Sequence, residues 1–106
     1  MLRKSTASVF PSTGIDQRLK AACVRTLLIT GLTTHACVAG AARDAVPLGY
    51  QVIVAADACA TRDLDTGAGE QSALPHAVQH RAALASIDDI FGDVMTTKQV
   101  LELALV

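Results

Sequence analysis

The sequence has no excess of basic charge, and this limits the partners that the protein can bind. Nine Lys and Arg residues stand against ten Asp and Glu residues in a chain of 106 residues, so the formal net charge is -1. Extended binding of nucleic acid or of an anionic membrane surface usually requires a basic excess or a basic stripe. Neither occurs along the sequence, and we therefore expect no nucleic-acid partner and no membrane partner.

Cysteine pairs with the spacing of metal or redox sites are missing too. The chain has three cysteines, Cys23, Cys37 and Cys59, and no two of them form a CxxC pair. Such pairs are the usual sign of structural zinc and of thioredoxin-like chemistry. Unpaired thiols are the default in a reducing compartment, so we expect a cytoplasmic protein. Cys23, at an apolar helix end, and Cys59, in an alanine-rich loop, are expected to be structural.

Long apolar runs are also lacking, although 51% of the residues are hydrophobic. None approaches the roughly 20 residues that a membrane helix needs, because polar residues such as Arg25 and Asp57 interrupt the candidates. The composition is typical of a globular chain with one small core, and residues 1–106 are expected to form a single domain. The opening MLRKSTASVF has basic and hydroxyl residues without an acid, so a mitochondrial presequence is the alternative to a turn that precedes a helix.

Apolar periodicity and turn residues predict helices that alternate with short strands. The strand QVIVAA at 51–56 has no polar alternation, as expected of a central strand that is covered on both faces. Strands that are each followed by a helix form a parallel sheet, because the crossover helix lets consecutive strands run in the same direction. The predicted fold class is therefore α/β, with a three-layer α/β/α parallel sheet. The predicted elements are helix 15–22, strand 26–30, helix 35–46, strand 51–56, a long polar loop 61–73 with mobile glycines at 66–70, helix 75–88, strand 93–96 and helix 97–105.

Cys37 is the main candidate for chemistry because of its place in the stretch TLLITGLTTHACVAGAARDA. A β-branched apolar run ends at Gly31 and helix formers begin at His35, which predicts a strand, a turn and a helix with Cys37 in its first turn. Unpaired backbone N–H groups and the positive end of the helix dipole favour a thiolate there and can hold an oxyanion. The same place is the carboxyl edge of the sheet, where open α/β sheets bind ligands. The alternative is that Cys37 is a small buried apolar residue.

Three stretches of the sequence resemble one known family. The run GLTTHACVAGAARDAVPLGYQVIVAADACATRD at 31–63 closely resembles the core signature of the isochorismatase-like cysteine hydrolases. Upstream, KSTASVFPSTGID at 4–16 is similar to the segment that carries the catalytic lysine of that family. Downstream, HRAALASIDDIFGDVMTT at 80–97 is similar to its closing helix and strand. The resemblance covers nearly the whole chain and implies a Rossmann-like α/β/α fold, of which the C-terminal half is present.

The resemblance also implies roles for individual residues. Cys37 matches the nucleophile, and Lys4 matches the catalytic lysine. The Leu32–Thr33 bond matches the non-proline cis peptide of the family, and the N–H groups of Thr33 and Cys37 match its oxyanion hole. Without the resemblance, Lys4 is read as a solvated terminal lysine.

One expected residue has no counterpart in the sequence. The third catalytic residue of the family is an aspartate at the end of the first strand, so the domain is expected to be truncated at its N-terminus. A missing strand leaves a sheet edge uncovered, which invites pairing with another chain, and we expect a homo-oligomer. Asp57 is a candidate replacement, although an aspartate at a strand end commonly bonds nearby backbone N–H groups, and the structural role is favoured. Arg43 and Asp44 are expected to form a solvated or interhelical pair.

His76 and His80 have the i, i+4 spacing that places two side chains on one helix face, so a metal site must be considered. No third ligand or HExxH pattern accompanies them, and we expect no metal and no cofactor. Because the amidase branches of the family use the cysteine, Cys37 implies hydrolysis of an amide or ureido C–N bond in a small molecule through an acyl-enzyme. The alternative function is a non-catalytic α/β remnant that acts only in assembly.

Overall fold

The computed structural model describes residues 2–65 and 73–104, so the glycines predicted to be mobile at 66–70 lie outside the described residues. None of the helices in these two stretches combines the length and the apolar character that crossing a membrane requires. The elements in chain order are α1 (Ile15–Ala21), β1 (Thr26–Leu32), the π-helical turn η1 (Thr34–Val38), α2 (Ala39–Ala45), the 3-10 turn η2 (Val46–Leu48), β2 (Gln51–Ala60), α3 (His76–Ile90), β3 (Asp93–Met95) and α4 (Thr97–Ala104).

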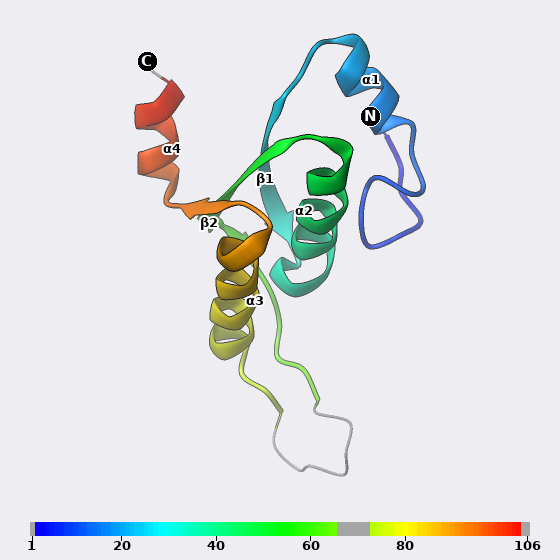
Figure 1. Ribbon diagram of the computed structural model, residues 1–106. Helices are drawn as coiled ribbons and strands as arrows, with labels where there is room; N and C mark the ends of the chain where they lie inside the picture. Colours follow the sequence, from blue (N-terminus) through cyan, green and yellow to red (C-terminus); the bar gives the residue numbers. More distant parts are fainter. Residues whose placement is uncertain (1, 66–72, 105–106) are drawn as a thin grey trace.

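Three parallel strands form one sheet in the order β1-β2-β3, which confirms the predicted α/β class (Figure 1). The strands β1 and β2 pair regularly as far as Ile29 opposite Val54. After an irregularity, Gly31 lies opposite Cys59. Within the described residues, no strand pairs with the other edge of β1.

Both long strands extend beyond their predicted ends. β1 continues to Leu32 instead of ending at residue 30, and β2 continues to Ala60 instead of ending at residue 56. The predictions stopped at Gly31 and before Asp57 because a glycine and a charged residue usually mark a strand end. In the structure, β2 bulges past Asp57 and then pairs with β1 again. Pairing between two strands, which local patterns do not reveal, therefore decided their lengths.

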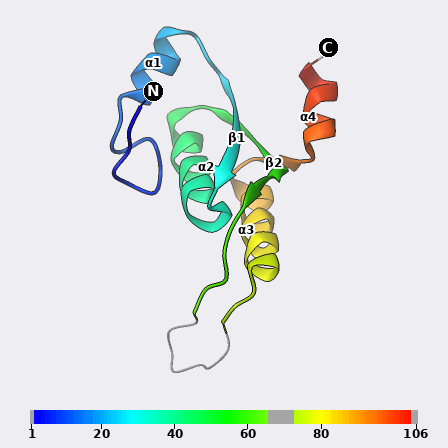
Figure 2. The same ribbon diagram turned by 180° about the vertical axis from the view of Figure 1, so that it is seen from behind.

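The core lies between β2 and the helices on one face of the sheet. β1 adds Leu27 and Ile29 to this core, whereas Leu28 and Leu32 point to the other face and are 52% and 68% exposed. The helices α2 and α3 lie side by side, and α4 stands apart from both (Figure 2). One face of the sheet is thus well covered, while β1 keeps exposed leucines on the other. The buried residues that form the main cluster of this core are Val38, Ala39, Ala42, Ala45, Tyr50, Val52, Val54 and Ile87.

Helix α1 is attached to the core through the ring and the hydroxyl of Tyr50. The hydroxyl donates a hydrogen bond to Asp16 Oδ1 at 2.6 Å, and Lys20 Nζ lies 3.2 Å from the same oxygen. Burial and the bond to Asp16 raise the pKa of Tyr50 to about 12. The Phe10 ring lies 6.0 Å from the Tyr50 ring, centroid to centroid. These contacts hold α1 and the segment before it against the domain.

Candidate active site

Cys37 lies in the turn η1, directly after β1. The Leu32–Thr33 peptide bond at this junction is cis. The carbonyl of Thr33 accepts hydrogen bonds from the N–H groups of Ala36, at 3.1 Å, and Val38, at 3.2 Å. The second bond spans five residues, which is the π-helical pattern. The single helix predicted at 35–46 is therefore divided into the π turn η1, the α-helix α2 and the 3-10 turn η2.

Two side-chain bonds tie η1 to the rest of the domain. The Thr34 hydroxyl is fully buried and lies 2.8 Å from Nδ1 of His80 on α3. The His35 Nδ1 lies 2.6 Å from the hydroxyl of Thr61, just after β2. Because the anchors come from both sides, the backbone around Cys37 is held between α3 and the end of β2.

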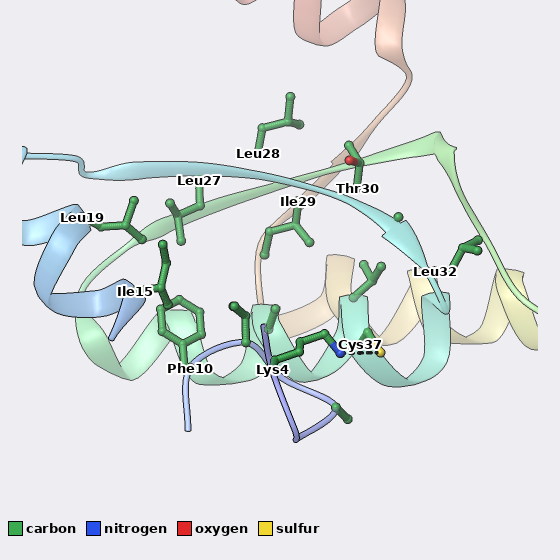
Figure 3. A pocket seen from close by; sticks show the side chains of 15 residues that line it. Lys4, Phe10, Ile15, Leu19, Leu27, Leu28, Ile29, Thr30, Leu32 and Cys37 are labelled. Atoms are coloured by element: carbon green, nitrogen blue, oxygen red, sulfur yellow. Dashed lines mark hydrogen bonds between the residues drawn. The ribbon is translucent and has the colours of Figure 1, made fainter. Parts of the chain in front are cut away.

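The Lys4 ammonium lies 3.4 Å from the Cys37 sulfur, across a separation of 33 residues (Figure 3). The ammonium also donates a hydrogen bond to the carbonyl oxygen of Thr6 at 3.1 Å. Lys4 is exposed and Cys37 is half-buried. A cation in contact with sulfur stabilises a thiolate, which is the reactive form of cysteine.

The lysine and the cysteine lie at one end of a pocket of about 440 Å³ between β1, α2 and the segment that carries Lys4. The other end of this pocket is apolar and is lined by Phe10, Ile15 and Leu19 (Figure 3). In the same view α2 lies below β1 and α4 lies above it. The lining also includes Leu28 and Leu32 from the other face of β1, so the pocket follows the edge of this strand. The arrangement provides a polar reactive end and an apolar wall.

Asp57 does not join this site. Its Oδ1 accepts hydrogen bonds from the N–H and the hydroxyl of Thr97, both at 2.7 Å, at the start of α4. These bonds hold the pKa of Asp57 below its ordinary value. The contacts are those of the favoured structural role. In the stretches 2–65 and 73–104, neither the hydrogen bonds nor the ion pairs of Lys4 and Cys37 include a carboxylate.

The two other cysteines have different surroundings. Cys59 packs against the core, and burial raises the pKa of its thiol. Cys23 is exposed just beyond α1, with a φ of 59°. Cys23 does follow the end of α1, as predicted, but its exposure gives no support to the structural role expected of it, because α1 itself has no buried residue.

The histidine pair is also divided between different partners. The His76 ring lies 2.9 Å from Asp63, which also accepts the His76 N–H at 2.7 Å, while His80 bonds to Thr34. Sequence reasoning considered His80 only as a partner of His76. It missed Thr34 and Thr61, and no local pattern could have found them, since their partners are 46 and 26 residues away.

Arg43 likewise has another partner than the one predicted. Its guanidinium lies 5.6 Å from the centre of the Phe91 ring, at the end of α3. No ion pair with Asp44 or with a neighbouring helix is present in the described part of the chain. Arg43 therefore joins α2 to α3 by a cation–π contact.

The fold and the site together define an α/β protein with a thiol and an ammonium in contact at the carboxyl edge of a parallel sheet. The family model described as Isochorismatase domain matches residues 1–99. The chain belongs to the isochorismatase family, as its sequence predicted.

Named relatives agree with this assignment. Streptothricin hydrolase of Streptomyces noursei is 35% identical over 84% of this chain and 32% of the relative. Ureidoacrylate amidohydrolase RutB of Methylobacterium radiotolerans is 38% identical over 87% of this chain and 31% of the relative. The crystal structure of a cysteine hydrolase from Pseudomonas syringae pv. phaseolicola matches with 34% identity and a TM-score of 0.85, over 93% of this chain and 46% of that one. The chain thus spans between about a third and a half of the length of these relatives.

Proposed function

We propose that this chain supplies the nucleophile of a cysteine hydrolase that cleaves an amide or ureido C–N bond in a small molecule. The observation that carries the proposal is the 3.4 Å contact between the Lys4 ammonium and the Cys37 sulfur at the carboxyl edge of the sheet. The names of relatives support the bond type, since they include an amidohydrolase and an N-carbamoylsarcosine amidase. No resident metal or cofactor takes part in the proposed reaction.

The proposed reaction has two steps. The Cys37 thiolate attacks the carbonyl carbon, a C–S bond forms, the C–N bond breaks, and the nitrogen takes up a proton and leaves as ammonia or an amine. Water then hydrolyses the thioester, which releases the acid and restores the thiol. Lys4 stabilises the thiolate, and the N–H groups of Thr33 and Cys37 hold the oxyanion in both steps.

A proton acceptor for the thiol must come from elsewhere. No carboxylate contacts Lys4 or Cys37 among the described residues, and Asp57 is occupied by Thr97. We propose that the acceptor is a carboxylate on a polypeptide segment that pairs with the free edge of β1. The pocket beside that edge is lined by β1 itself, so a strand added there reaches the thiol.

The test is an amidase assay on the 106-residue chain, alone and with the N-terminal half of a longer relative added in trans or by fusion. Nicotinamide, N-carbamoyl amino acids and ureido acids serve as substrates. We expect little or no activity from the chain alone, because losing one member of a catalytic unit costs on the order of 10⁴-fold or more. We expect the added half to restore activity, and Cys37→Ala to abolish it. Turnover at ordinary enzymatic rates by the chain alone, lost in Cys37→Ala, would overturn the proposal that the acceptor comes from a separate segment.

The exposed edge of β1 and the exposed side chains of Leu28 and Leu32 favour a second function, assembly without catalysis. An unpaired strand edge invites pairing with another chain. Under this alternative the chain forms a stable homo-oligomer in which the thiol of Cys37 has ordinary reactivity. Sedimentation analysis together with alkylation of Cys37 separates the two functions, because only the catalytic proposal requires a reactive thiol.

A further inference from the structure

Lys4 is exposed and close to the start of the chain, so its contact with Cys37 needs something to hold it. Long side chains near a terminus are usually mobile unless other groups fix the backbone. The segment that follows Lys4 is rich in hydroxyl residues. We propose that the side chains of Ser12 and Thr6 are positioning residues, which hold the Lys4 ammonium against the Cys37 sulfur. This inference rests on the role proposed above for Lys4.

The two hydroxyls form a directed series of hydrogen bonds. Thr6 Oγ1 donates to the carbonyl of Ser8 at 2.6 Å, which uses its only proton. The 2.8 Å contact between the Thr6 and Ser12 hydroxyls must therefore be donated by Ser12. The Ser12 oxygen in turn accepts the Ser5 N–H at 3.0 Å. Each hydroxyl donates once and accepts once, so loss of either one breaks two bonds.

These hydrogen bonds fix the backbone before and after the Thr6 carbonyl, whose oxygen accepts a hydrogen bond from the Lys4 ammonium. The Lys4 ammonium bridges the Thr6 carbonyl and the Cys37 sulfur. Ser5, next to Lys4, is tied to Ser12, and Thr6 is tied to both Ser12 and Ser8. The Thr6 carbonyl is thereby held at the place where it directs the ammonium toward the thiol.

The segment is also docked on the helix that follows the thiol. Ser8 is only 7% exposed, and its hydroxyl accepts the N–H of Phe10 at 3.2 Å. A Cβ added at Gly40, three residues after Cys37, would lie 3.4 Å from the Cβ and the N of Ser8. The lysine segment therefore rests on α2, the helix that directly continues the turn with Cys37.

The experiment follows the rate at which iodoacetamide alkylates Cys37 in the 106-residue chain as a function of pH, with Cys23 and Cys59 replaced by serine. Lys4→Gln is the reference variant. We expect it to move the midpoint of the alkylation profile to higher pH and to lower the rate at neutral pH by about fivefold. This factor is the upper end of the range for the contribution of an exposed ion pair. Ser12→Ala and Thr6→Val are expected to produce at least half of that change. Ser12→Thr, which keeps the hydroxyl, is expected to restore the original profile.

Thr13→Val is the matched control. The Thr13 hydroxyl also makes two bonds in this segment, to the Val9 carbonyl at 2.6 Å and from the Ile15 N–H at 3.2 Å, but neither reaches Lys4. His35, on the same turn as Cys37, is bonded to Thr61 and is unchanged in every variant, so its contribution cancels. Circular dichroism melts show whether each variant folds, and Thr6→Val replaces Ser12→Ala if the latter does not.

The outcomes separate the inference from the proposal on which it rests. If Lys4→Gln shifts the profile and both hydroxyl variants keep the original one, the positioning role is wrong and the role of Lys4 stands. If Thr13→Val shifts the profile as far as Ser12→Ala does, the effect is a general loosening and the inference fails. If Lys4→Gln has no effect, the role of Lys4 fails and the inference fails with it.

Discussion

The two segments that meet at the site, the turn η1 with Cys37 and the segment 4–13 with Lys4, are held in different ways. The turn is anchored from inside, since Thr34 is fully buried and bonds to His80 on α3. The lysine segment is held at its surface by hydroxyl bonds and by one buried residue, Ser8. Loss of the Thr34–His80 bond leaves a half-buried ring without its partner, whereas water readily replaces the exposed hydroxyl bonds of the lysine segment. The turn should therefore govern stability, and the lysine segment should govern reactivity.

Thr34→Val gives the largest expected effect and tests the internal anchor. The substitution keeps the shape of the side chain but leaves His80 without its partner. We expect the free energy of unfolding to fall by about 1–1.5 kcal/mol, the upper part of the range for one hydrogen bond, because the His80 ring is only half-buried. Urea unfolding measures it. Thr30→Val is the control, since Thr30 is exposed on β1 and should change stability far less. Equal losses of unfolding free energy in Thr34→Val and Thr30→Val would contradict the view that the turn η1 governs stability.

The relative reactivity of the three thiols is the second test. We expect iodoacetamide at neutral pH to alkylate Cys37 at least about tenfold faster than Cys59, because burial raises the pKa of Cys59 while Cys37 contacts an ammonium. Peptide mass mapping after limited labelling gives the ratio. Cys23 is exposed and serves as the internal standard for an ordinary thiol. Faster labelling of Cys23 than of Cys37 would remove the basis for a reactive site.

Gly40 offers a smaller change at the junction of the two segments. A Cβ at this position meets Ser8 at 3.4 Å, which is ordinary contact. We therefore expect Gly40→Ala to fit and to raise the free energy of unfolding by about 0.5–1 kcal/mol through helix propensity. Gly40→Leu should push Ser8 away and slow the alkylation of Cys37. Thermal melts and the alkylation assay measure the two effects, and unchanged reactivity in Gly40→Leu would show that the docking of Ser8 is unimportant.

The smallest expected effect is on the pH dependence of stability. It involves Asp63 and its bonds to His76 at the start of α3, the helix that anchors η1. The N–H and the ring of His76 hold the pKa of Asp63 below its ordinary value of 3.8. A lowered pKa means that the ionised carboxylate stabilises the folded state above the ordinary value, and that this contribution is lost as pH falls through the folded value. Asp63→Asn should therefore lose stability near pH 5 to 6, and its difference from the original chain should shrink toward about pH 3. Thermal melts across this range give the result, with Asp89→Asn on the same helix as the control.

Local patterns predicted much of the architecture. The order of helices and strands, the parallel sheet and the place of Cys37 just after β1 follow from apolar periodicity and from the glycine at residue 31. The resemblance singled out Lys4, which composition and spacing left as a solvated terminal lysine. Patterns of this kind work because each depends on residues that are close in the chain.

Tertiary structure decided what depends on distant residues. It set the ends of β1 and β2 and formed the hydrogen bond between His80 and Thr34. It brought the Lys4 ammonium into contact with the Cys37 sulfur, across 33 residues of sequence. It also turned the hydroxyls of Thr6 and Ser12 into a connected series. The physical reason is that strand pairing and side-chain contacts form between segments that the fold brings together, and such contacts leave no periodic signal in either segment alone.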